Sequence, residues 1–148
     1  PNDVRKKKIA ARCMIMAQAG QYNYPRISRR GENVALHLTV AEFIRATGSM
    51  VYLLNKRYQP FYKWLHRGLS ELPVLGIEVA KLLKELVGDA KQYERNTDII
   101  EEICRLIIAE LHRQRLSDSD ADFMVEHGIS VHLGIEDEIL QNTNPWVE

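Results

Sequence analysis

Residues 98–115 read DIIEEICRLIIAELHRQR, and this stretch decides the fold class. Its apolar side chains recur every three or four positions, at Ile99, Ile103, Leu106, Ile107 and Leu111. This period is typical of a helix with one buried face, because an α-helix completes a turn in about 3.6 residues. We therefore predict a helix over residues 92–115 that packs against other helices.

The same period predicts helices on both sides of this stretch. Their ranges are 3–19, 32–57, 60–72, 75–88, 119–133 and 135–141. Gly31, Pro60 and Pro73 separate several of them, at places where helices commonly end. Paired strands would need alternating apolar residues bounded by hairpin turns, and we find no convincing example. The predicted fold is all-α, a bundle of five to seven helices over residues 1–142, with residues 143–148 as a flexible tail.

Local patterns give further expectations about loops and faces. Residues 20–31, GQYNYPRISRRG, are predicted to be a loop that begins at Gly20. The inward face of the 32–57 helix is predicted to contain Val34, Leu38, Ala41, Phe43, Ile44, Val51 and Leu54. That of the 75–88 helix is predicted to contain Val79, Leu82, Leu83, Leu86 and Val87.

Composition narrows the class of protein. The chain has 148 residues, of which 45% are hydrophobic and 27% charged, so a single globular domain is expected. Two cysteines, Cys13 and Cys104, are too few for a disulfide scaffold or a four-cysteine zinc site, and we expect both to be buried apolar residues. No uncharged apolar run approaches the roughly 20 residues that span a bilayer. We expect a cytoplasmic protein with no membrane contact, and Pro1 in place of methionine suggests part of a longer chain.

The charges are unevenly distributed although the formal net charge is zero. Residues 1–97 carry 17 Lys/Arg and 8 Asp/Glu, whereas residues 98–148 carry 3 and 12. Residues 4–31 contain eight basic side chains and no acidic one. This asymmetry indicates either a site for an anionic partner or two segments that neutralise each other within the fold.

Several kinds of active site are excluded or disfavoured. Asp118, Asp120 and Asp122 resemble the start of a calcium loop, but Phe123 and Ile129 stand where glycine and glutamate are needed. The five histidines form no zinc-binding pair of the usual helical type. Six residues separate Arg105 from His112, a spacing that resembles the motif of helical ribonuclease toxins; we retain this as a minor alternative.

The most informative segment for function is YLLNKRYQPFYKWLHR, residues 52–67. Its tyrosines and Trp64 can stack on a base, and arginine can bind phosphate with two nitrogen atoms. We expect Phe61, Trp64 and Leu65 to lie in the core. The basic side chains either form a rim that faces phosphate or extend to water along the surface. They are Lys56, Arg57, Lys63 and Arg67.

A similar mixture occurs in QAGQYNYPR, residues 18–26. Tyr22 and Tyr24 either pack on the end of the bundle or line a cleft together with Arg26. The pattern alone does not separate these two interpretations.

Three segments carry a resemblance to a known family. QAGQYNYPR (18–26), EFIRATGSMVYLLNKRY (42–58) and PFYKWLHRGLSELPVLG (60–76) resemble a helical domain of unknown function that follows a nucleotidyltransferase domain in bacterial and archaeal proteins. DSDADFMVEHG (118–128) resembles the end of that domain. The resemblance covers roughly residues 5–135. It implies a bundle similar to the C-terminal helical domain of aminoglycoside nucleotidyltransferases, which helps to form the substrate cleft.

The preferred hypothesis is therefore an accessory domain that forms part of a substrate cleft and is not catalytic by itself. Its partner would be the upstream nucleotidyltransferase domain, and Mg²⁺ and a nucleoside triphosphate are expected for the parent chain and not for this part. The alternative is a stand-alone module that binds RNA or another polyanion through the basic first half. The predicted substrate-binding residues are Tyr22, Tyr24, Arg26, Lys56, Arg57, Tyr58, Tyr62, Lys63, His66 and Arg67.

Overall fold

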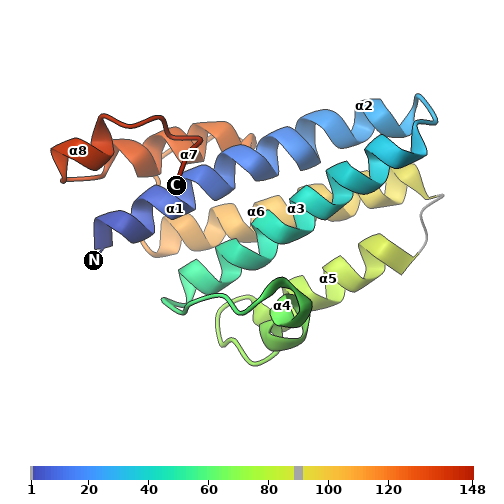
Figure 1. Cartoon of the computed structure of the whole chain (residues 1–148), viewed down its shortest axis with the longest axis horizontal. Helices are drawn as coiled ribbons and strands as arrows, with labels where there is room; N and C mark the ends of the chain where they lie inside the picture. Colours follow the sequence, from blue (N-terminus) through green and yellow to red (C-terminus); the bar gives the residue numbers. More distant parts are fainter. Residues whose placement is uncertain (1, 89–91) are drawn as a thin grey trace.

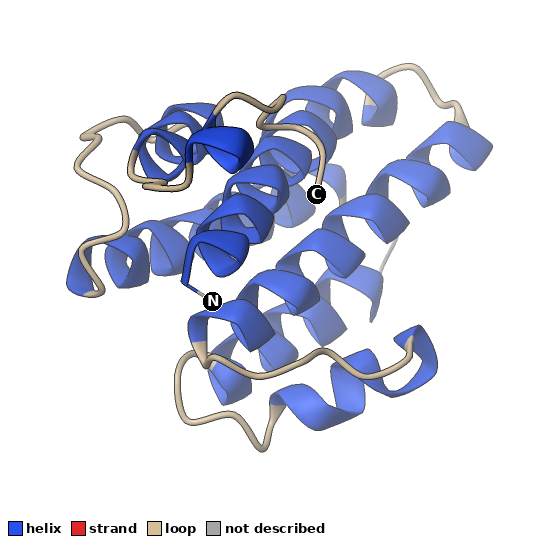
Figure 2. Cartoon of the chain, turned by 60° about the vertical axis from the view of Figure 1, so that its left-hand side comes forward, coloured by secondary structure: helices blue, strands red, loops and turns tan. Residues whose placement is uncertain are grey.

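The helix that the sequence marks most clearly, α6 (Tyr93–Arg113), runs along the core of the protein. Ile99, Ile103, Ile107 and Leu111 on its apolar face are completely buried. The computed structural model describes residues 2–88 and 92–148, and within these ranges every regular element is a helix. Figure 2 shows the helices and their connecting loops, so the predicted all-α fold is confirmed.

Residues 2–28 form one long, almost continuous helical rod. α1 (Asn2–Ile15) leads into η1 (Met16–Asn23), a wider π-helical segment, and then into the short α2 (Tyr24–Ser28). The predicted loop over residues 20–31 is thus wrong for its first nine positions. Pro25 lies in the first turn of α2, where its missing N–H costs nothing. Gly20 continues the rod because its lack of a side chain lets Phe43 and Ile100 pack closely against it.

α3 (Asn33–Leu54) lies beside α1 and carries two apolar stripes. The buried stripe includes Leu36, Phe43 and Met50. The predicted inward residues Val34, Leu38 and Ala41 are exposed instead, with 78% of Val34 and 64% of Leu38 accessible. The stripe that faces the core is therefore the one that contains Leu36 and Phe43. Of the predicted inward residues, Phe43, Val51 and Leu54 are buried as predicted.

The short helix α4 (Tyr62–Leu69) packs on the C-terminal half of α3. Leu65 lies directly over Gly48, where a methyl group would come within 2.8 Å of the leucine side chain. Leu65 is therefore buried as expected. Phe61 and Trp64 are 67% and 48% exposed, which corrects their predicted place in the core. A helix of only eight residues offers a single inward row, and Leu65 and Leu69 occupy it.

The remaining helices complete the bundle around α6 and α1. α5 (Gly76–Gly88) packs against α6 and buries Val79, Leu82, Leu83 and Leu86, but the predicted inward residue Val87 is 58% exposed. α7 (Met124–Leu133) lies along α1, and α8 (Glu138–Gln141) follows it at the same end of the molecule (Figure 1). The predicted 119–133 helix begins five residues later than expected, because Ser117 and Ser119 bond within the preceding loop.

Three further features complete the description of the fold. Residues 143–148, predicted to be a flexible tail, return to α1, where Lys7 Nζ donates to the main-chain oxygen of Asn144. Cys13 and Cys104 are buried free thiols, as expected, and burial is the main cause that raises the pKa of both. No helix in the described ranges is long and apolar enough to cross a bilayer.

Candidate functional site

A hollow of about 700 Å³ lies between α1, the C-terminal end of α3 and the loop that follows α3. We call it the basic groove. Its cationic lining residues are Arg5, Lys8 and Arg12 from α1, and Lys56 and Arg57 from the loop. Among the described residues that line it, Glu148 alone is acidic. The groove therefore has the charge expected of a site for an anion.

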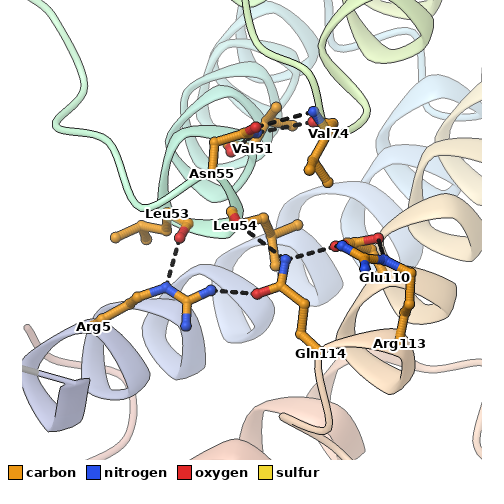
Figure 3. A network of polar contacts seen from close by, with 9 residues as sticks. All are labelled: Arg5, Val51, Leu53, Leu54, Asn55, Val74, Glu110, Arg113 and Gln114. Carbon is orange, nitrogen blue, oxygen red and sulfur yellow. Dashed lines mark hydrogen bonds and ion pairs between the residues drawn. The ribbon is translucent and has the colours of Figure 1, made fainter.

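Arg5 joins the two walls of the basic groove. Its Nε atom donates to the main-chain oxygen of Leu53 at 2.7 Å, and its Nη2 atom donates to Gln114 Oε1 at 2.5 Å. Figure 3 shows this network, in which Gln114 also bonds to Leu54 and Glu110. Burial lowers the pKa of the Arg5 guanidinium, yet arginine remains charged at any physiological pH. Arg5 thus adds positive charge to the groove and fixes its width.

Lys56 is presented by the C-terminal cap of α3. Its N–H bonds to the oxygen of Leu53, and the N–H of Arg57 bonds to the oxygen of Tyr52, which together form a Schellman motif. Lys56 takes the left-handed position of the motif, with φ of 54°, where glycine is usual. That conformation costs a residue other than glycine of order 1 kcal/mol. Lys56 adopts it and lines the basic groove.

Asn55 holds the other side of the same loop. Its side-chain amide donates to the oxygens of Val51 and Val74, and its Oδ1 atom accepts from the N–H of Val74. This clamp appears at the top of Figure 3 and joins the end of α3 to the segment before α5. The loop that carries Lys56 and Arg57 is thereby fixed at its start.

Arg12 also lines the groove, and 14% of its side chain is exposed. Its Nε atom donates to Ser49 Oγ at 2.8 Å, and its Nη2 atom forms an ion pair with Glu148. Burial is the largest cause that lowers the pKa of Arg12; the nearby Arg45 lowers it further, whereas Glu42 acts in the opposite direction. Arg12 is therefore a poorly hydrated cation that requires an anion beside it.

A second hollow, of about 370 Å³, adjoins the basic groove. We call it the aromatic hollow, because Phe61 and Tyr62 line it with ring centroids 4.5 Å apart. It shares Arg12, Ser49, Gln59 and Glu148 with the basic groove. The two hollows thus place a cationic surface next to an aromatic one.

The structure gathers some of the predicted substrate-binding residues and separates others. Lys56, Arg57 and Tyr58 line the basic groove, and Tyr62 lines the aromatic hollow. Lys63 and Arg67 line neither hollow; they flank the ring of Trp64 at 5.6 and 5.5 Å. His66 Nε2 lies 2.9 Å from the oxygen of Ala80, which ties α4 to α5.

The predicted residues of the 18–26 segment lie at the other end of α3, near α2 (Figure 1). Arg26 stacks on the ring of Tyr22, 3.7 Å from its centroid. Tyr24 is 1% exposed and belongs to the core, which corrects the expectation that it could line a cleft. Burial raises the pKa of its phenol, and a side-chain hydrogen bond with Asn96 opposes this shift. These residues do not share a site with Lys56 and Arg57.

The basic run at residues 5–8 is divided between two sides of α1. Arg5 and Lys8 line the basic groove, whereas Lys6 and Lys7 bond to Gly134 and Asn144 of the C-terminal region. Positions 5, 8 and 12 are three and four residues apart, so they share one helix face. This spacing was the signal in the sequence that could have assigned Arg5, Lys8 and Arg12 to one site.

Other candidate chemistries find little support in the geometry. Arg105 and His112 line neither hollow, and His112 Nε2 lies 2.8 Å from the oxygen of Ser119. Ser117 Oγ lies 2.8 Å from His127 Nδ1, but both side chains are buried, with His127 completely inaccessible. Within the described part of the chain, no three His, Cys, Asp or Glu residues are grouped as metal ligands.

Comparison with known proteins gives one finding. A family model described as a domain of unknown function (DUF4037) matches residues 1–65. The match spans α1 to the first half of α4 and therefore includes every cation of the basic groove. No curated protein and no solved structure matches the chain.

Proposed function

We propose that this chain is an accessory helical domain of a nucleotidyltransferase, whose basic groove forms part of the cleft for a phosphate-bearing substrate. The observation that carries the proposal is the arrangement of five cations around one hollow. Phosphoryl transfer depends mainly on positioning and on stabilisation of negative charge, and side chains from a second domain can contribute to both.

In this proposal the partner is an upstream nucleotidyltransferase domain of the same cytoplasmic protein. That domain binds Mg²⁺ and the nucleoside triphosphate, and the present chain has no turnover by itself. The support is the resemblance of residues 18–26, 42–58 and 60–76. Within the cleft, Lys56 and Arg57 contact phosphate oxygens, while Tyr58, which is 98% exposed, contacts the rest of the substrate.

The test uses Lys56, because its backbone conformation allows a substitution that does not disturb the fold. Lys56→Gly removes one groove cation and places glycine where φ is positive. Arg115→Gly is a matched control: Arg115 has φ of 56° in the same kind of helix cap at the end of α6, and it does not line the groove. Both variants should be at least as stable as the wild type in urea denaturation.

Binding of inorganic pyrophosphate is then measured by calorimetry at low, fixed ionic strength. We expect Lys56→Gly to weaken binding roughly tenfold, the effect of losing about 1.4 kcal/mol from one charge-assisted hydrogen bond. Arg115→Gly should bind like the wild type. Equal affinity in both variants, or hydrolysis of a nucleoside triphosphate by residues 1–148 above background, would contradict the proposed role.

Single-stranded RNA is a second candidate ligand, and one observation favours it. Tyr58, Phe61, Tyr62 and Trp64 are all exposed within seven residues, next to the groove cations. Bases stack readily on such rings, and binding of a polyanion weakens steeply with salt. An RNA oligomer that binds with a steep salt dependence while pyrophosphate does not bind would favour this candidate over the first.

A further inference from the structure

The basic groove already holds an anion, and that anion belongs to the chain itself. The carboxylate of Glu148 forms an ion pair with Arg12 and lies 3.8 Å from Lys8 Nζ. Glu148 also lines the aromatic hollow, so its side chain stands where the two hollows meet. An external anion that contacts Lys8 and Arg12 must therefore compete for the same positions.

Arg12 needs a negative charge beside it, which explains why an anion occupies the position of the Glu148 carboxylate. Its guanidinium is largely buried, and the neighbouring Arg45 adds a repulsive positive charge. Glu42 acts in the favourable direction, but its own ion pair is with Arg45, at 3.7 Å. A buried cation without a counter-ion is costly, so Glu148 or another anion has to accompany Arg12.

The segment that carries Glu148 is held by a few polar contacts and by the partly covered Trp146. Besides the contacts of Glu148, a hydrogen bond from Lys7 Nζ to the oxygen of Asn144 joins the segment to α1. Trp146 and Val147 are 41% and 58% exposed, so release of the segment would bring the covered part of the indole into water. Partly exposed ion pairs contribute about 1 kcal/mol or less, which a competing anion can match.

We infer that residues 144–148 are an internal acidic ligand of the basic groove, and that a phosphate-bearing ligand displaces them when it binds. This inference rests on the proposed anion-binding function of the groove. Because the segment is tethered, its local concentration at the groove is in the millimolar range, and weak ligands are excluded. Binding of the external ligand and release of the segment are thus coupled, because both anions use Arg12.

The first test compares the wild type with Glu148→Gln in pyrophosphate binding. If Glu148 occupies the groove nine-tenths of the time, removal of its charge should raise the affinity about tenfold. Glu138→Gln, which removes an exposed carboxylate on α8, is the matched control for the change in net charge. It should change the affinity less than twofold at 0.15 M salt, because such long-range effects are screened.

The second test observes release directly. Trp64 and Trp146 are the two tryptophans, so Trp64→Phe leaves Trp146, within the segment, as the sole indole reporter. Saturating pyrophosphate should shift the Trp146 emission to longer wavelength as the ring enters water. The same addition to Trp64→Phe combined with Glu148→Gln should give a smaller shift, since that segment is already released.

The outcomes separate the two proposals. Tighter binding in Glu148→Gln together with the Trp146 shift supports both. Equal affinity in the wild type and Glu148→Gln, with unchanged Trp146 emission, overturns the internal ligand and leaves the anion-binding groove intact. Failure of pyrophosphate to bind either protein overturns the proposed function itself.

Discussion

The guanidinium of Arg5 on α1 is bonded to the main-chain oxygen of Leu53 on α3, at 2.7 Å. The same side chain reaches Gln114 at the end of α6, so three helices meet at one cation. The contact joins α1 to the end of α3, and both residues line the basic groove. It also means that a residue of the candidate site is part of the framework that holds the site open.

Arg5→Met should therefore lower stability as well as anion binding. Methionine keeps the apolar stem but removes the donor to Gln114 Oε1 and one of the donors to the Leu53 oxygen, a loss of about 1.5–3 kcal/mol for bonds to a charged group. Urea denaturation would measure the change. Arg29→Met, at an exposed position after α2, should change the free energy of unfolding by less than about 0.5 kcal/mol. Equal effects of the two substitutions would show that Arg5 does not join the helices.

Gly20→Ala should destabilise the rod formed by α1, η1 and α2. The added methyl group would lie 2.5 Å from Phe43 Cδ2 and 2.9 Å from Ile100 Cγ2, inside the core. Such overpacking typically costs about 1–3 kcal/mol. The comparison is Gly88→Ala at the end of α5, where no atom lies within 4 Å of the new methyl group. A thermal melt in which both variants unfold at the same temperature would contradict this account of η1.

The sequence was sufficient to predict α6 but not the orientation of α3. On α6 a single apolar face alternates with charged residues, so Ile103 and Ile107 could point only inward. On α3 two apolar stripes compete: Leu36 and Phe43 lie on one, and Val34 and Leu38 on the other. Their period is the same, and only the positions of α1 and α6 decide which stripe is buried.

The candidate site was predictable where it depends on local sequence. Lys56 and Arg57 follow directly from the aromatic and basic segment at residues 52–67, and both line the basic groove. Arg12 and Glu148 could not be paired in this way, because no local pattern brings positions 12 and 148 together. The expected core position of Phe61 was wrong for a related reason: Leu65 packs over Gly48 of α3, and no local pattern showed that Leu65 and not Phe61 would be buried there.

Glu110 makes the stability of the bundle depend on pH. Its side chain is 8% exposed and accepts from Arg113 at 2.6 and 2.7 Å, and from Gln114 at 2.6 Å. The bonds from Arg113 are the largest cause that lowers the pKa of Glu110, and the bond from Gln114 lowers it further, against the opposing effect of burial. Through Gln114 this carboxylate also supports Arg5 in the network of Figure 3.

A carboxylate whose pKa is lower in the folded state stabilises the protein at a pH above its unfolded pKa of 4.5. That contribution is lost as the pH falls through the folded pKa. Glu110→Gln should thus be about 1–2 kcal/mol less stable than the wild type at neutral pH. The difference should shrink as the pH falls from 4.5 toward 3. Urea denaturation across this range measures it, and Glu94→Gln, at an exposed position of α6, serves as the control. A difference that stays constant from neutral to acidic pH would mean that the charge of Glu110 does not stabilise the fold.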